Sequence, residues 1–247
     1  MNESTWNRPL PLSHHQRIFS NLIDLHRITR DWLRALGIEG PAKPHEIQRV
    51  FSPEIKSRFM KLDSLMDDAE NRALEHLIPE TSVESFLTRL HYTVWAVQGW
   101  TLQNLFEKTD EPERPALLNL LEQSSWKTGR QIASRKWQDT ASNFAQAMPN
   151  VVSAIKEAPL MHSDMGQGFI VERLTSTSVS LSWLKCPHTL TVMETQSVVE
   201  TLCHLHHQVI RGYLYALNPA LRSSREAGVV PNHSCCRLHF HFSAESL

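Results

Sequence analysis

The spacing of the apolar residues changes once along the chain, close to Gly166, and this change limits the fold more than any other feature of the sequence. Before Gly166, apolar residues recur every three or four positions, as they do in amphipathic helices. After it come short runs of β-branched and aromatic residues, which favour strands. Helices followed by strands are typical of an α+β fold.

Prolines and glycines divide the first 150 residues into segments of helical length. Pro53 is expected to open one helix, and Pro149 to close the last, because proline is tolerated in the first turn of a helix but not in its interior. No strand is expected before Gly166. The expected helices cover residues 18–36, 53–65, 81–102 and 116–148.

The C-terminal part is expected to form a β-β-α-β-β unit, with one helix packed on an antiparallel sheet. Residues 1–150 form the helical region, and residues 151–247 form the region that carries the Cys, His and Arg residues. We expect the two to pack as one compact unit. The expected elements are a hairpin of 169–174 and 179–186, a helix over 189–217, and strands over 221–230 and 235–242.

Composition argues against several classes of protein. The 247 residues have a formal net charge of −1 with acids and bases mixed throughout, so no nucleic-acid-binding surface is expected. No low-charge run is long enough to span a bilayer, and no basic segment followed by an apolar run begins the chain. Four cysteines do not make a disulfide framework in a chain of this length. A reduced, cytoplasmic protein is the simplest expectation.

The residues best suited to catalysis or metal binding lie in the last quarter of the chain. All four cysteines and half of the fourteen histidines follow Lys185. Cysteine and histidine supply thiolate nucleophiles, general acids and bases, and soft metal ligands. Their concentration in one region therefore locates the candidate site.

On a helical wheel, His206 lies near the middle of an apolar face, and Cys203 lies one turn before it on the same face. The stripe also contains Val199, Ile210, Tyr213 and Leu217. A buried imidazole needs a hydrogen-bond partner. His206 can therefore be a core histidine bonded to a backbone carbonyl, or part of a reactive pair with Cys203. We expect His204 and His207 to be solvated.

In the last strand, alternation places Cys236 on the same face as Leu238 and Phe240. This face should point toward the helix, so we predict that Cys203, His206 and Cys236 line one cavity between helix and sheet. Cys236 can also be read as a small core residue, because free cysteine is often buried. His239 and His241 are expected on the outer face.

Three further residues are candidates for substrate chemistry. Cys186 ends a strand directly before a helix, and His188 follows closely enough to act as its base, although it can also simply begin the helix. Arg225 can form two parallel hydrogen bonds to a carboxylate, or can be an ordinary surface arginine of a strand.

The order of these residues resembles the C-terminal half of the L-2-amino-thiazoline-4-carboxylate hydrolase-like family, which is itself similar to the 4-vinyl reductase-type domain. The resemblance covers residues 166–243. Where the family has Cys-x-x-Asp in its helix, this chain has Cys203-x-x-His206. The matching positions are Cys186, Cys203, Leu217-Asn218-Pro219, Arg225 and Cys236.

The resemblance implies a biosynthetic enzyme without a cofactor that hydrolyses a C–N bond of a cyclic amidine or a related amino-acid-derived compound. In such an enzyme a thiolate attacks the amidine carbon and an imidazole moves protons. Cys203 with His206 is the expected catalytic pair, Cys186 is the alternative nucleophile, and Arg225 with His188 would bind a carboxylate-bearing substrate. The helical half would roof the pocket, with His91, Trp95 and Trp100 as wall residues.

The alternative is a non-catalytic module that binds a small molecule or zinc, as in vinyl-reductase-type sensors. A set of thiolate and imidazole ligands suits zinc. No close Cys-x-x-Cys pair supports such a site, and the sequence leaves a homo-oligomer open. The four ligands would be Cys186, Cys203, His206 and Cys236.

Overall fold

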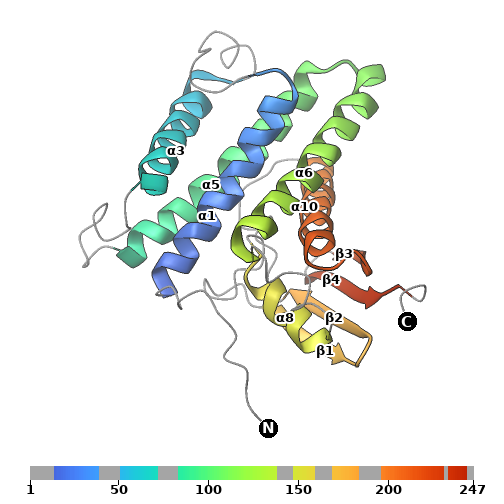
Figure 1. Ribbon diagram of the computed structural model, residues 1–247. Coiled ribbons are helices and arrows are strands. Elements are labelled where there is room, and N and C mark those ends of the chain that lie inside the picture. Colours follow the sequence, from blue (N-terminus) through green and yellow to red (C-terminus); the bar gives the residue numbers. More distant parts are fainter. Residues whose placement is uncertain are drawn as a thin grey trace.

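The computed structural model describes residues 14–38, 51–71, 83–137, 147–158, 169–183, 196–230 and 233–243 (Figure 1). Its helices are α1 (His14–Ala35), α3 (Pro53–Asn71), α5 (Val83–Lys108), the short 3-10 helix η2 (Glu111–Glu113), α6 (Arg114–Trp137), α8 (Met148–Lys156) and α10 (Gln196–Leu217). Its strands are β1 (Phe169–Leu174), β2 (Ser178–Trp183), β3 (Leu221–Val230) and β4 (His233–Phe242).

The helical half is a bundle in which α1 packs against both α5 and α6, and α3 packs against α5 (Figure 1). The three- and four-residue spacing predicted for α1 is confirmed, since Leu22, Leu25 and Ile28 are fully buried. Trp32 Nε1 donates a hydrogen bond to Ser125 Oγ at 2.8 Å, which ties α1 to α6 inside the core. The first strand begins at Phe169, so the described residues before Gly166 contain no strand, as predicted.

A buried polar contact joins α1 to α3. His26 Nε2 lies 3.2 Å from Asp63 Oδ1, and Arg30 Nε lies 3.1 Å from the same oxygen. Burial is the main reason that the pKa of His26 is lowered, although the neighbouring carboxylate opposes the shift. The imidazole is therefore held neutral in the core at pH 7.

The four strands form one antiparallel sheet in the order β1-β2-β4-β3. The hairpins β1–β2 and β3–β4 are joined by pairing between β2 and β4, where Val179 lies opposite Phe240. One face is apolar and buried, through Val179, Leu181, Leu238 and Phe240. The predicted α+β fold, with a helical first half and a C-terminal antiparallel sheet that carries a helix, is confirmed.

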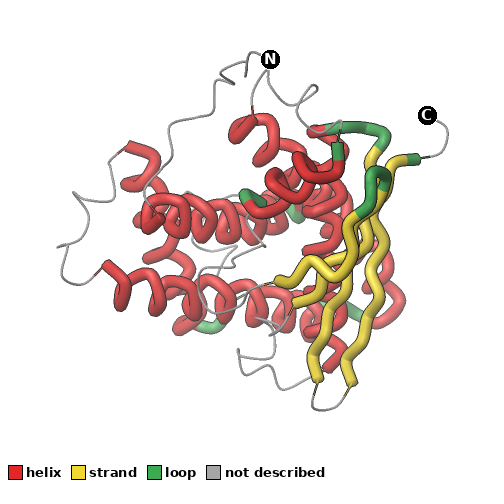
Figure 2. The backbone as a smooth tube through the Cα atoms, turned by 90° about the horizontal axis from the view of Figure 1, so that it is seen from below, coloured by secondary structure: helices red, strands yellow, loops and turns green. Residues whose placement is uncertain are grey.

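Helix α10 makes its most extensive contacts with α6 and also contacts β3. Figure 2 shows the strands together on one side of the helices. Two glycines allow the close packing of α10 against α6. A Cβ added to Gly212 would overlap the carbonyl oxygen of Trp126 on α6, and one added to Gly129 would overlap the carbonyl oxygen of Val209 on α10. Glycine is needed at both positions because only its missing side chain lets the two backbones approach.

Several expected boundaries were wrong. Helix α1 begins earlier than expected, at His14, and α3 and α5 continue further than expected, to Asn71 and Lys108. Helix α6 ends at Trp137, and Pro149 lies in the first turn of α8 instead of closing the long helix. Proline suits that first turn because its missing N–H would have had no helical acceptor. Strand β4 begins at His233, two residues before the expected start at Cys235. In the described part of the chain, no helix is both long and apolar enough to cross a membrane.

Candidate active site between helix α10 and strand β3

His206 points from α10 into the helical bundle. Its Nε2 lies 2.8 Å from Gln98 Oε1 of α5, and only 5% of the residue is exposed. The ring of Trp95 meets the imidazole edge-on, with 5.1 Å between the ring centroids and 79° between the planes. The prediction that His206 occupies the buried face of α10 is confirmed, and one of its contacts is with a side-chain amide of another helix.

Cys203 lies one turn before His206 on α10. It is half-buried and forms no disulfide with another described residue. Helical side chains lean toward the N-terminus of their helix, so the imidazole of His206 extends over the turn that contains Cys203. The pairing of Cys203 with His206 stays a prediction.

His207 was predicted to be solvated, and this prediction is wrong. The residue is half-buried against the sheet, with Nε2 3.1 Å from Ser223 Oγ of β3. Its pKa is lowered to about 4, first by burial and then by the positive charges of Arg211, Arg225 and His204. The helical wheel predicted a single buried face for α10. In the structure, α5, α6 and β3 cover this helix on different sides.

His204 lies on the α6 side of α10, where its Nε2 is 2.9 Å from Glu122 Oε1. Its side chain is 41% exposed. The predicted solvent exposure of His204 is therefore confirmed, with an ion-pairing partner that the sequence did not indicate.

Arg225 is half-buried on the face of β3 that looks toward α10. It lies opposite Leu238 in the β3–β4 register, and Leu238 belongs to the buried face of the sheet. Its guanidinium is close enough to lower the pKa of His207. Within the described part of the chain, Arg225 forms no ion pair or hydrogen bond. A partly buried guanidinium on this face, with no acid among the described residues to pair with it, is suited to an external anion.

Other predicted site residues lie outside what the structure describes. Cys186 and His188 fall in the segment between β2 and α10, and the side chain of Cys236 is not described, although its backbone pairs with Ala227. The predicted convergence of Cys236 with the helix stays a prediction. Among the described side chains, no three His, Cys, Asp or Glu residues group closely enough to hold a metal ion.

The three residues predicted to line the wall of the pocket lie in different parts of the helical bundle. Trp95 packs against His206, and His91 packs against Trp95 with 6.1 Å between the ring centroids. Burial lowers the pKa of His91 to about 4. Trp100 is half-buried near α3, where the guanidinium of Arg58 lies 5.0 Å above its ring. Trp95 is therefore the predicted wall residue that contacts His206.

The outer face of the sheet carries His239 and His241, as predicted. His239 Nδ1 lies 2.8 Å from Ser180 Oγ, and its Nε2 lies 3.2 Å from Glu226 Oε1. Arg237 forms a 2.7 Å ion pair with Glu172 on the same face. The charges of Arg237 and Glu172 therefore neutralise one another. Arg225, on the opposite face, has no such acid among the described residues.

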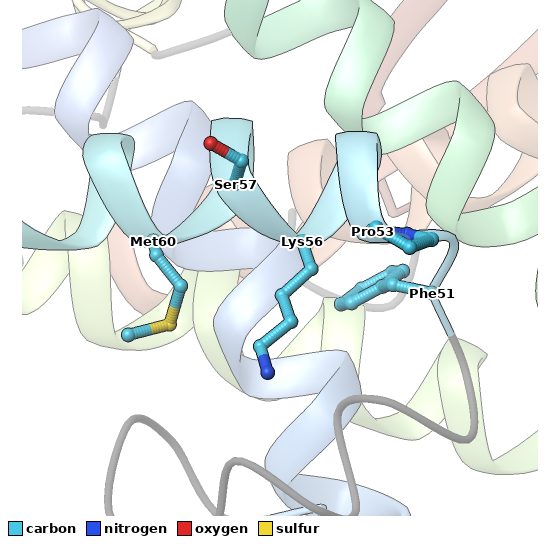
Figure 3. Close-up of a pocket in the computed structure, with 5 residues that line it drawn as sticks. All are labelled: Phe51, Pro53, Lys56, Ser57 and Met60. Atoms are coloured by element: carbon cyan, nitrogen blue, oxygen red, sulfur yellow. The ribbon is translucent and has the colours of Figure 1, made fainter.

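A separate pocket lies beside α3 and contains none of the predicted site residues (Figure 3). Its volume is about 450 Å³. The side chains of Lys56 and Met60 point to the same side of the helix (Figure 3). The lining consists of Phe51, Pro53, Lys56, Ser57 and Met60.

No family model matches the chain, and no curated protein matches it. A similar solved structure is that of a trafficking protein particle complex subunit 3 from Naegleria fowleri covalently bound to palmitic acid. The two chains are 12% identical, the alignment covers 62% of this chain and 95% of that one, and the TM-score is 0.41. This likeness is too weak to assign a fold family or a function, and it neither supports nor contradicts the resemblance described above.

Proposed function

We propose that the protein is a small-molecule hydrolase that cleaves a C–N bond of a cyclic amidine bearing a carboxylate, in a biosynthetic pathway. The observation that carries the proposal is Arg225, a half-buried cation that faces α10 and pairs with no acid in the described part of the chain. Cys203, a candidate nucleophile, lies on that same helix. The absence of a disulfide at Cys203 among the described residues fits the reducing, cytoplasmic compartment that we propose for the protein.

Arg225 would hold the carboxylate of the substrate. A guanidinium offers two parallel N–H donors to a carboxylate, which fixes the orientation of the anion as well as its position. His207 and Ser223 lie beside Arg225 at the same interface between α10 and β3. With its pKa lowered to about 4, His207 is neutral at pH 7 and does not compete with Arg225 for the anion.

Cys203 would attack the amidine carbon. The thiol proton passes to the imidazole of His206, the Sγ–C bond forms as the C–N bond breaks, and the departing nitrogen takes that proton from the imidazolium. Water then attacks the sulfur-bound carbon, the C–S bond breaks, and the thiol is restored. Cys186 is the alternative nucleophile of the proposal.

The proposal is tested by incubating the full chain with 2-amino-thiazoline-4-carboxylate and related cyclic amidine carboxylates, and by following the ring-opened product by mass spectrometry. Cys203→Ser should abolish turnover, since serine is a far poorer nucleophile at neutral pH. Arg225→Lys should raise KM more than it lowers kcat, because the paired donors are lost and the charge is kept.

Arg222→Lys is the matched control for Arg225→Lys, since Arg222 lies on the same strand and is exposed. Turnover in Cys203→Ser equal to that of the wild type would move the nucleophile to Cys186. Equal turnover in both cysteine variants, or no turnover of any compound in the series, would contradict the proposal.

A further inference from the structure

Ser223 and Arg225 lie on the same face of β3, the face toward α10. Their partners in the β3–β4 register are Phe240 and Leu238, which both belong to the buried face of the sheet. Residues two positions apart in a strand are separated by about 7 Å, so a side chain that contacts Ser223 is also near Arg225. His207 is such a side chain, since its Nε2 lies 3.1 Å from Ser223 Oγ and Arg225 acts on its charge.

The charged groups around His207 oppose its protonation. On α10 they are Arg211 and His204, and on β3 the group is Arg225. Glu122 of α6 also reaches α10, but it is bonded to His204, with 2.9 Å between its Oε1 and the imidazole Nε2. Among the described residues, no carboxylate offsets the cations that act on His207. Together with burial, these cations lower the pKa of His207 to about 4.

A carboxylate bound to Arg225 would change this balance. It would place a negative charge beside the imidazole and offset the charge of the guanidinium, and both effects favour the protonated form of His207. When binding of an anion favours uptake of a proton, the anion must bind more tightly as the pH falls, because the two binding equilibria are linked.

We propose that the carboxylate held by Arg225 binds together with one proton, which His207 takes up from solvent. The inference rests on the proposed function for the identity of the anion, and it deepens that function by making binding at the same site sensitive to pH. The imidazolium donates through Nε2 to the hydroxyl oxygen of Ser223, because both nitrogens of a charged imidazole are donors. The hydroxyl hydrogen of Ser223 is then free to turn toward the carboxylate.

Trifluoroacetate is a suitable probe, because it is a carboxylate that stays ionised between pH 5.5 and pH 7.5 and its binding to the full chain can be followed by ¹⁹F NMR. We expect the bound carboxylate to restore the pKa of His207 from about 4 to its ordinary value of about 6.5. The dissociation constant should then be about tenfold lower at pH 5.5 than at pH 7.5.

His207→Gln, whose side chain can still bond to Ser223, should bind trifluoroacetate at pH 7.5 and lose most of this pH dependence. His241→Gln is the matched control and should keep the tenfold change, because His241 is an exposed histidine on the opposite face of the sheet.

Uptake of the proton is measured directly by an NMR titration of the His207 ring. With saturating trifluoroacetate, the pKa of His207 should rise above the value of about 4 that it has without the anion. Arg225→Met should abolish this rise, because the carboxylate is no longer held beside the imidazole.

Absence of binding at both pH values, equal dissociation constants at the two, or a His207 pKa that trifluoroacetate does not change would overturn the inference. Full pH dependence in His207→Gln would also overturn it, and if this variant does not fold, the NMR titration decides. Binding with proton uptake in a chain that hydrolyses no amidine would refute the proposed function and leave the inference intact. Hydrolysis of the amidine with binding that does not depend on pH would refute the inference alone.

Discussion

Gly212 of α10 lies against the backbone of Trp126 on α6, at a distance that leaves no room for a Cβ atom. Gly129 of α6 makes the equivalent approach to Val209, so each helix supplies one glycine to the crossing. The position of α10, and with it the placement of Cys203, His206 and His207, depends on this crossing.

Gly212→Ala should therefore lower the free energy of unfolding by about 1–3 kcal/mol or more, because the added methyl group meets backbone and not a flexible side chain. Urea unfolding followed by circular dichroism measures this change. Lys127→Ala, at an exposed position of α6, is the control and should stay within about 0.5 kcal/mol of the wild type. A Gly212→Ala variant as stable as this control would show that the crossing is looser than described.

Arg225→Met should remove binding of a carboxylate and leave the protein as stable as the wild type or more so. A half-buried cation without a partner loses hydration without gaining an ion pair, and an apolar side chain of similar length avoids that cost. Binding of a substrate carboxylate is measured by calorimetry, and stability by urea unfolding. Arg222→Met on the exposed side of β3 is the control. A large loss of stability in Arg225→Met alone would instead indicate a structural arginine.

Stability should fall between about pH 6.5 and pH 4 through His207. Its pKa is about 4 in the folded protein and about 6.5 when unfolded, so in this window the unfolded chain binds more protons than the folded one. The contribution of His207 to the free energy of unfolding is complete above pH 6.5 and declines as the pH falls to 4. It amounts to about 3 kcal/mol at most. His91 adds a loss of the same sign in the same window, because its pKa is lowered to about 4.

Urea unfolding at pH 7 and at pH 4.5 checks this expectation. His207→Gln, which can still bond to Ser223, should lose less stability on acidification than the wild type. An equal loss in both proteins would mean that His207 is protonated in the folded state at pH 4.5.

His206→Asp should give a folded protein in which the proposed turnover has a different pH dependence. The substitution restores the residue type that the resembled family has at this position, and it changes the proton-transfer group from imidazole to carboxylate. Turnover measured from pH 5 to 9 should differ in shape from that of the wild type. Identical profiles would remove His206 from proton transfer.

The elements of the fold were largely predictable because their signals are local. The apolar spacing predicted α1, and β-branched residues around Thr175 predicted the first hairpin. Pro149 misled the prediction because proline can either end a helix or begin one, and the sequence before it stays helical in character.

The surroundings of the site were less predictable because they depend on contacts between distant segments. His206 was placed on the buried face of α10, but no pattern links it to Gln98 on another helix. His207 was misplaced because a helical wheel does not show that β3 covers a second side of α10. That no acid among the described residues pairs with Arg225 is likewise visible only once the strands are paired.

The central position of β4 has a consequence for the order in which the sheet assembles. Each hairpin closes through neighbouring residues, whereas the pairing of Val179 with Phe240 must bring together strands separated by the whole of α10. Closing a long loop costs more entropy than closing a short one, and distant pairings slow folding. We expect both hairpins to form early and to join late, with the docking of α10 onto α6 as the step that brings them within reach. A mutation at the glycine crossing would then slow folding as well as destabilise the folded state.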